Sequence, residues 1–202
     1  MARITAARAG GIPRLALLDT IALCEFGSAM LRESDDGYDL IVGSLPGHLH
    51  RITSYADHPQ IFVDLPKYGV TSSAAGRYQF LAKTWDGLVR QYAFPDFSPE
   101  SQDLGAIALV RERGALTLLD TGRVELAIQA CHGVWASLPG ATYGQQVRSM
   151  AFCMAAYQAA LDHYTGKLGQ PANAPDFSNV IAGVDSTAPA WTHDDWKPQI
   201  AA

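Results

Sequence analysis

The 202-residue sequence predicts an α+β fold that is mostly helical, with one small antiparallel β-sheet after the first helix. Apolar residues recur at three- and four-residue steps in several segments, as in helices packed on a core. After the first of these segments, two short apolar runs flank turn residues, which indicates paired strands. With 48% hydrophobic and 17% charged residues, the composition is that of a globular protein.

The first predicted helix starts near Pro13, because proline is well suited to a first helical turn. Gly27 follows the apolar pattern and predicts the end of the helix. The apolar positions of this helix are Leu15, Leu18, Ile21 and Ala22.

Basic residues before this helix loosely resemble the start of a signal peptide. Asp19 and Thr20 interrupt the apolar run, however, and no small-residue cleavage site follows it. We therefore expect an amphipathic helix and a protein that folds in the cytoplasm.

The predicted sheet is formed by residues 38–44 and 51–55, joined by a turn at residues 45–47. A loop that contains Pro59 and Pro66 follows, and leads to a small, polar stretch at residues 71–76. Helical spacing resumes at Arg77 and continues to Val89.

Three further helices complete the predicted domain. Ser98 and Pro99 form a cap and first turn for a helix to about Arg113. Thr121 is the expected cap of a helix over residues 123–135, which a break at residues 136–140 ends. The last helix is expected over residues 145–164.

We expect one catalytic domain over residues 10–165 and a Pro/Ala-rich C-terminal extension over residues 166–202. The extension has little periodicity, which predicts a flexible segment. Trp191 and Trp196 are unusual in such a segment and predict docking on the domain or on a partner.

The composition argues against several classes of protein. The net charge of −5 disfavours nucleic acid as a partner, since phosphate binding needs clustered Lys and Arg. Apolar runs of about ten residues are too short to span a membrane. The three cysteines, Cys24, Cys131 and Cys153, are far apart in the sequence and suggest neither a disulfide framework nor a zinc site. No metal or other cofactor is expected.

Glu25 is the candidate catalytic residue. It lies seven residues after Leu18, on or beside the apolar stripe of its helix. Burial would raise the pKa of its carboxyl group, and the negative end of the helix dipole would act in the same direction. A carboxyl group that stays protonated near neutrality can serve as a general acid.

A second carboxylate would change the chemistry. Hydrolysis of a glycosidic bond normally uses two carboxyl groups, whereas an intramolecular attack by a sugar hydroxyl can use one. Asp35, Asp36 and Asp39 are near enough in the sequence to supply a second one. Spacing alone therefore leaves both reactions open.

Seven segments, in order over residues 15–164, resemble the lambda phage endolysin family. They are C-E-F-G-S at 24–28, D-D-G-Y-D-L-I-V-G at 35–43, Y-A-D-H-P at 55–59, A-G-R-Y-Q-F at 75–80, D-F-S-P-E-S-Q-D at 96–103, R-E-R-G-A-L at 111–116 and W-A-S-L-P-G-A-T-Y-G-Q at 135–145. One departure is Cys24, where the family usually has a small polar residue before the glutamate.

The resemblance implies a lysozyme-like fold and lytic transglycosylase activity on peptidoglycan, with Glu25 as the catalytic residue. Such enzymes cut the β-1,4 bond between N-acetylmuramic acid and N-acetylglucosamine and leave a 1,6-anhydro sugar. We also expect a monomer without stable membrane insertion. Because no export signal is recognised, release from the host cytoplasm to the periplasm and cell wall through a phage holin is the expected route.

The candidate substrate-binding residues surround an expected cleft. Aromatic faces suit sugar rings, and the amide of Gln79 can donate to and accept from an N-acetyl group. Burial tendencies favour a core position for Trp135, and Tyr143 with Gln145 are expected to be more exposed. The full set is Tyr38, Asp39, Gly76, Arg77, Tyr78, Gln79, Trp135, Tyr143 and Gln145.

Two alternatives remain at this stage. The first is a hydrolytic muramidase or chitinase-like glycosidase that uses Asp36 or Asp39 as its second carboxylate. The second is a catalytically inactive glycan-binding domain of a virion.

Overall fold

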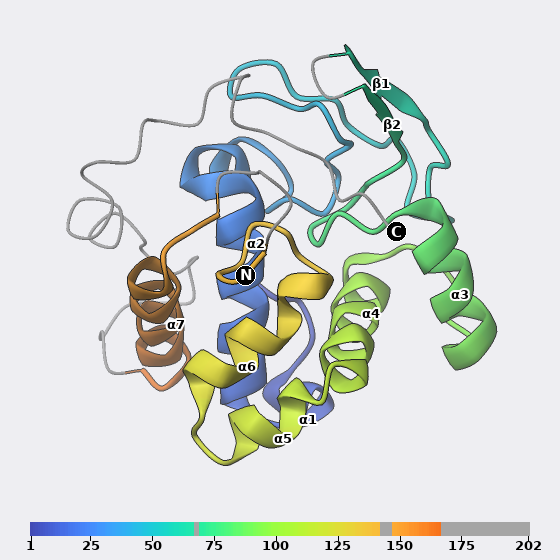
Figure 1. Ribbon diagram of the computed structural model, residues 1–202. Helices are drawn as coiled ribbons and strands as arrows, with labels where there is room; N and C mark the ends of the chain where they lie inside the picture. The colour runs from blue at the N-terminus through green and yellow to red at the C-terminus, as the bar shows by residue number, and fades with distance from the viewer. Residues whose placement is uncertain (67–68, 142–146, 167–202) are drawn as a thin grey trace.

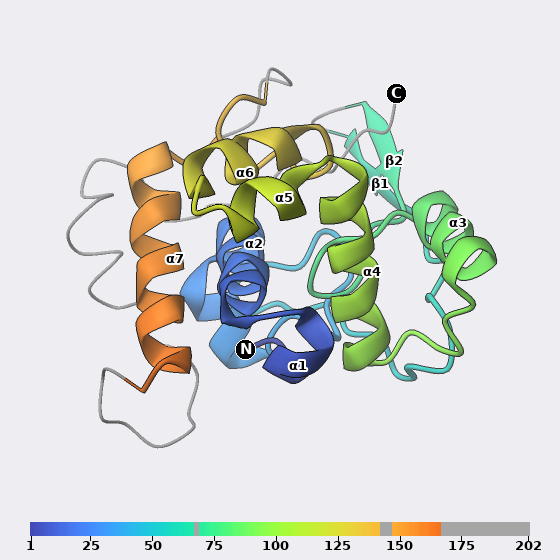
Figure 2. The same cartoon turned by 90° about the horizontal axis from the view of Figure 1, so that it is seen from below.

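A long central helix organises the fold of the computed structural model, which describes residues 1–66, 69–141 and 147–166. This helix is α2 (Ile12–Glu33), and α7 (Met150–Tyr164) forms the most extensive helix contact with it. Figure 2 shows α2 between α7 and α4 (Pro99–Glu112), with the short helices around its ends. The small sheet lies apart from this bundle, near the top of Figure 1.

All residues of α2 from 15 to 27 are buried, including the polar Asp19, Thr20 and Glu25. The prediction of an amphipathic helix was therefore wrong, because other helices enclose α2 instead of leaving one face to solvent. The prediction of Pro13 in the first turn was right. Burial of Glu25 thus follows from the enclosure of the whole helix and not from its place on a stripe.

Gly27 marks a kink in α2 and not its end. Its φ of 69° and ψ of 164° are not helical, and the helix resumes beyond it to Glu33. A positive φ favours glycine, because a Cβ atom makes this conformation costly. The kink leaves Glu25 in the last regular turn before the break.

The sheet is antiparallel but lies further along the chain than predicted. Strand β1 (Val63–Leu65) pairs with β2 (Val70–Ser72), and Val63 lies opposite Ser72. The predicted strands at 38–44 and 51–55 meet in an isolated bridge between Leu40 and Arg51, and Ile41 forms another isolated bridge with Ala75. Positive φ angles at Gly37 and Gly43 interrupt this segment, and its consecutive residues 38–42 are all buried, which an alternating strand does not allow.

The helices around α2 are shorter than their periodicity suggested. Ser98 caps α4 through its hydroxyl group, as predicted, and α7 begins at Met150 with Ser149 as its cap instead of at 145. Thr121 ends a short helix that the sequence did not predict, and does not cap the next one. The other elements are α1 (Ala6–Ala9), α3 (Ala82–Tyr92), α5 (Ala115–Asp120), α6 (Val124–Ala130) and the 3-10 turn η2 (Cys131–Gly133).

The N-terminal segment belongs to the core. Ile4 and Ala9 are 3% and 1% exposed, so the packed region extends beyond the expected boundary at residue 10. The extension from residue 167 onwards, with Trp191 and Trp196, lies outside the described residues.

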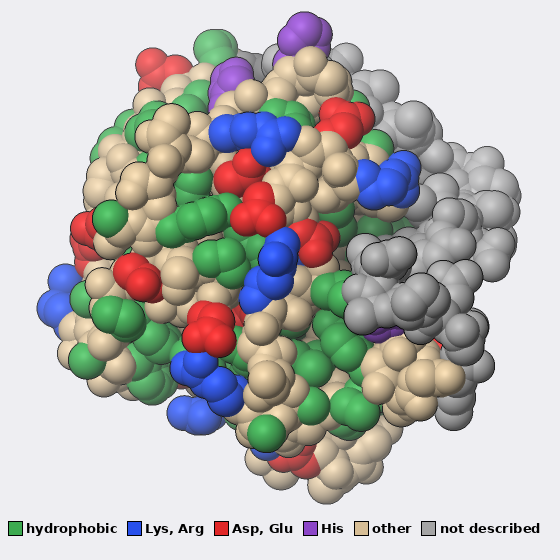
Figure 3. Space-filling model, turned by 180° about the vertical axis from the view of Figure 1, so that it is seen from behind, with side chains coloured by type: hydrophobic (Ala, Val, Ile, Leu, Met, Phe, Trp, Pro, Cys, Tyr) green, Lys and Arg blue, Asp and Glu red, His purple; other side chains and the backbone are tan. Residues whose placement is uncertain are grey.

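Charged side chains of both signs alternate on the face shown in Figure 3. The described part of this face therefore shows no large area of one sign that would attract a polyanion. Ion pairs between charged side chains include Arg3 with Asp35 and Arg51 with Asp39. In the described part of the chain, no helix has the length and hydropathy needed to cross a bilayer.

Candidate active site

Glu25 is a buried carboxyl group that accepts a hydrogen bond from a distant segment. Its side chain is 7% exposed, and the Ser137 hydroxyl donates to Glu25 Oε1 over 2.6 Å. Burial raises the pKa of Glu25 to about 7, against a smaller lowering effect of the Ser137 hydrogen bond. The carboxyl group can therefore hold or release a proton near neutral pH.

Ser137 is held in place by backbone hydrogen bonds. Its carbonyl oxygen accepts from the backbone N–H of Arg148 over 2.9 Å, which ties this segment to the residues before α7. Two positions earlier, the indole of Trp135 is fully buried and donates to the carbonyl of Tyr78 over 3.0 Å. The sequence pattern indicated Trp135 but not Ser137, although both lie in the same family-like segment.

The turn at residues 75–80 contacts the Ser137 segment through that Trp135 hydrogen bond. Ala75 and Phe80 pair across the turn, and Gly76 has a φ of 76°. A Cβ atom on Gly76 would lie 2.3 Å from Gln102 Oε1, so glycine is needed for close packing. The predicted helix from Arg77 begins only at Ala82, because this turn occupies the preceding residues.

Gln79 has two unfavourable features in this turn. Its φ of 48° lies in the left-handed region, which costs free energy for a residue with a side chain. Its amide nitrogen donates to the Gly76 carbonyl over 3.0 Å, but Oε1 is buried and accepts no hydrogen bond from any residue that the structure describes. Strained backbone and unsatisfied polar atoms are both enriched at functional sites.

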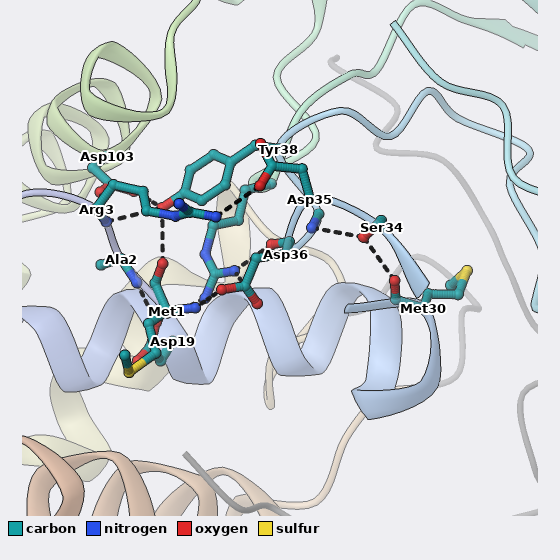
Figure 4. Close-up of polar contacts among 12 residues, drawn as sticks. Met1, Ala2, Arg3, Asp19, Met30, Ser34, Asp35, Asp36, Tyr38 and Asp103 are labelled. Carbon is teal, nitrogen blue, oxygen red and sulfur yellow. Dashed lines mark hydrogen bonds and ion pairs between the residues drawn. The ribbon is translucent and has the colours of Figure 1, made fainter. Parts of the chain in front are cut away.

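Three other predicted residues lie in a buried polar network. The hydroxyl groups of Tyr38 and Tyr78 donate to Asp103 Oδ1 over 2.7 and 2.6 Å. The Arg77 guanidinium pairs with Asp19 over 2.7 Å, and both side chains are 1% exposed. Figure 4 shows Tyr38 beside Asp103 and the N-terminal residues, above helix α2.

This network encloses the N-terminal segment. The backbone N–H of Ala2 donates to Asp19 Oδ1 over 2.8 Å, and that of Ile4 donates to Asp103 Oδ2 over 3.0 Å. The structure therefore places Tyr38, Arg77 and Tyr78 inside the protein, where they hold α2, α4 and the N-terminal segment together.

The three candidates for a second carboxylate are all engaged. Asp39 accepts from Arg51 over 2.6 Å and from the backbone of Asp35 over 2.9 Å. Asp35 accepts from Arg3 and from the Tyr55 hydroxyl, over 2.7 and 2.8 Å. Asp36 Oδ1 lies 3.1 Å from the Arg77 guanidinium.

The remaining expectations fall partly outside the described residues. Tyr143 and Gln145 lie in the segment 142–146, which the structure does not describe. Within the described ranges, no group of three or more His, Cys, Asp or Glu side chains could hold a metal ion. The expectation of a reaction without cofactor stays a prediction.

A buried central helix that carries a protonatable glutamic acid, in a mostly helical fold with one small antiparallel sheet, is the arrangement of a lysozyme-like protein. The family model for endolysins matches residues 15–164. The chain therefore belongs to the endolysin family, the lysozyme-like phage enzymes that degrade the bacterial cell wall.

Individual relatives agree with this assignment. The endolysin of Escherichia phage P2 is 42% identical over 152 residues, which cover 72% of this chain and 90% of the relative. The endolysin of Escherichia phage lambda is 46% identical over 134 residues, or 65% and 80% of the two chains. The solved structure of bacteriophage lambda lysozyme with a chitohexasaccharide has a TM-score of 0.66 and 39% identity, and covers 79% of this chain and 97% of that one.

Proposed function

We propose that the protein is a peptidoglycan lytic transglycosylase in which Glu25 is the catalytic acid and base. The observation that carries this proposal is the buried carboxyl group of Glu25, whose pKa of about 7 suits it to proton transfer in both directions. The bond cleaved is the β-1,4 linkage between N-acetylmuramic acid and N-acetylglucosamine.

The reaction has two proton transfers. Protonated Glu25 donates its proton to the bridging oxygen as the bond from that oxygen to C1 breaks. The resulting carboxylate then accepts the proton of the C6 hydroxyl group, and the C6 oxygen bonds to C1 of the same sugar to close the 1,6-anhydro ring. This ring closure is intramolecular, so it gains the entropic advantage of a nucleophile that is already in position.

Ser137 supports the carboxylate stage of this cycle. Its hydroxyl group donates to Glu25 Oε1, and a hydrogen bond to an ionised group is stronger than one between neutral groups. The bond also limits rotation of the carboxyl group, which keeps the second oxygen, Oε2, directed to one place. Ser137 thus acts as a positioning residue in the proposed mechanism.

The partners of the nearby aspartates favour a reaction with one carboxyl group. A hydrolase would need one of them as base or nucleophile. The carboxylates of Asp35 and Asp39 are each shared between a guanidinium and a second donor, and that of Asp36 faces Arg77. A carboxylate whose oxygens already accept from protein donors has less capacity to bind and orient a water molecule, so none of the three is well placed to activate water.

The predicted substrate-binding residues take different parts in this proposal. Gln79 is the best candidate for direct contact, because its Oε1 could accept from an N-acetyl N–H. Tyr38, Arg77, Tyr78 and Trp135 act through packing, and Gly76 and Asp39 through the shape of their loops. Tyr143 and Gln145 remain proposed direct contacts.

Glycan strands of peptidoglycan are the proposed partner. A related lysozyme has been solved with a chitohexasaccharide, which is a chain of β-1,4-linked N-acetylglucosamine. Action as a monomer, release from the host cytoplasm through a holin and the lack of nucleic-acid binding remain part of the proposal.

Product analysis tests the reaction. Purified sacculi are digested with the enzyme, and the released fragments are analysed by mass spectrometry. Fragments with 1,6-anhydro ends support transglycosylation, whereas fragments with reducing ends, heavier by one water, would establish the hydrolytic muramidase instead.

A matched variant tests the role of Glu25. Glu25→Gln should lower fragment release by roughly 10²–10⁴-fold while binding to sacculi survives. If the unchanged protein binds sacculi but releases no fragments, the chain is a glycan-binding domain without activity.

A further inference from the structure

Two cysteines that are far apart in the sequence meet in the core beside the candidate catalytic residue. Cys24 on α2 and Cys153 on α7 are 129 positions apart, yet their sulfur atoms lie 3.6 Å from each other. Both side chains are fully buried. The two cysteines are not a close pair in the sequence, because only helix packing brings them together.

The geometry points to Cys24 and Cys153 as a site of reversible oxidation, at which an intramolecular disulfide forms and joins α2 to α7. A disulfide has an S–S length of about 2.05 Å, so the two sulfur atoms need to approach by roughly 1.5 Å. Rotation of the side chains about their Cα–Cβ bonds can supply part of this movement. The sulfur atoms already face each other across the helix contact.

The reaction is a thiol–disulfide exchange with a small disulfide donor. One cysteine, as thiolate, attacks a sulfur atom of the donor and releases the first donor thiol. The second cysteine then attacks the mixed disulfide, which forms the Cys24–Cys153 bond and releases the second donor thiol. Two electrons and the two cysteine protons pass to the donor, which is reduced to two thiols.

The environment of the pair sets the conditions for this reaction. The hydrogen bond with Cys153 and then burial raise the pKa of Cys24 well above its usual value. The thiolate is therefore scarce in the closed fold, and exchange requires a transient opening between α2 and α7. A protein in a reducing compartment stays in the dithiol form, and an oxidising compartment favours the disulfide.

The bond would stabilise the folded enzyme. Closing a loop of this length strongly restricts the unfolded chain, so the thermal midpoint Tm should rise by roughly 5–15 °C. The bond also fixes the residue next to Glu25 on its helix. The inference does not depend on the reaction that Glu25 catalyses, and its test does not require lysis.

The experiment uses the reduced full-length protein, exposed to oxidised glutathione with and without mild urea. Free thiols are then alkylated and counted by mass spectrometry. The expected product has lost two hydrogen atoms, keeps one alkylated cysteine, Cys131, and has a raised Tm that returns to its initial value on reduction.

Two variants complete the test. Cys153→Ala should give no intramolecular bond, whereas Cys131→Ala should still form it, because the thiol contact is between Cys24 and Cys153 and Cys131 lies in η2. Three alkylated cysteines in the wild type after treatment in mild urea would overturn the inference. Stable glutathione adducts, a bond that requires Cys131, or a lowered Tm would do the same.

Discussion

The hydroxyl group of Ser137 donates a 2.6 Å hydrogen bond to Glu25 across 112 positions of sequence. Within the described part of the chain, this bond is what lowers a carboxyl pKa that burial raises to about 7. The balance between burial and this one donor therefore determines the protonation state of the proposed catalytic group, and the first two predictions follow from it.

The activity should fall as the pH rises through about 7. Only protonated Glu25 can donate to the bridging oxygen, so kcat/KM should have an alkaline limb with an apparent pKa near 7. Initial rates of sacculus digestion between pH 4 and pH 9 give this profile. An activity that stays constant up to pH 9 would contradict the assignment of Glu25 as the acid.

Ser137→Ala should shift the alkaline limb of the kcat/KM profile to higher pH by roughly one unit, because a donor to the Glu25 carboxylate is removed. The maximal rate should also fall, since the carboxylate stage loses its support. Ser54→Ala, at an exposed loop position, is the matched control and should leave the profile unchanged. A shift of the alkaline limb to lower pH in Ser137→Ala would disprove the proposed role of Ser137.

Glu25→Gln should change how stability depends on pH. The folded-state pKa of about 7 lies above the ordinary value of 4.5, so the folded protein retains this proton at a pH where the unfolded chain has lost it. Stability due to Glu25 therefore falls between pH 4.5 and 7 and stays low above pH 7.

Between pH 4 and pH 8, the free energy of unfolding of the wild type should thus fall by up to roughly 3 kcal/mol more than that of Glu25→Gln. Urea unfolding at both values measures this difference. Glu125→Gln, at an exposed position on α6, should follow the wild type. Parallel curves for wild type and Glu25→Gln would show that the group titrates normally.

Asp19→Ala should destabilise the fold strongly. The Arg77–Asp19 pair is 1% exposed on both sides, and removal of one partner leaves a buried charge that costs about 3–5 kcal/mol. A fall in Tm of roughly 10 °C or more is expected. Glu100→Ala breaks the half-exposed pair with Arg8 and should shift Tm by no more than about 3 °C. Equal shifts for the two variants would argue against a structural role for the buried network.

Gln79 and Gln60 form a natural comparison, because both are glutamines with a positive φ, of 48° and 53°. Gln60 is exposed and Gln79 is buried with an unsatisfied oxygen. Gln60→Gly should raise Tm slightly, by about 1–3 °C, and leave activity unchanged. Gln79→Gly should lower kcat/KM at least about 10-fold, because the proposed N-acetyl contact is lost. Full activity of a folded Gln79→Gly would exclude that contact.

The sequence was most informative where the signal was local or carried by family-like segments. The positions of Pro13 in α2 and of Ser98 in α4 followed from capping chemistry, which involves only neighbouring residues. The sheet was displaced, because apolar runs at 38–44 looked like a strand, whereas positive φ angles at Gly37 and Gly43 break the pairing. Such φ values depend on the packing around a loop as well as on its residues.

By itself, the sequence determined an α+β chain with a candidate glutamic acid on its first long helix. Only the tertiary structure decided what surrounds that group. Helix packing encloses α2. It also brings together Ser137 with Glu25 and Cys24 with Cys153, two pairs whose members are more than a hundred positions apart. Burial and hydrogen bonding between such residues depend on how whole helices pack, and helix packing has no signature in a local pattern of residues.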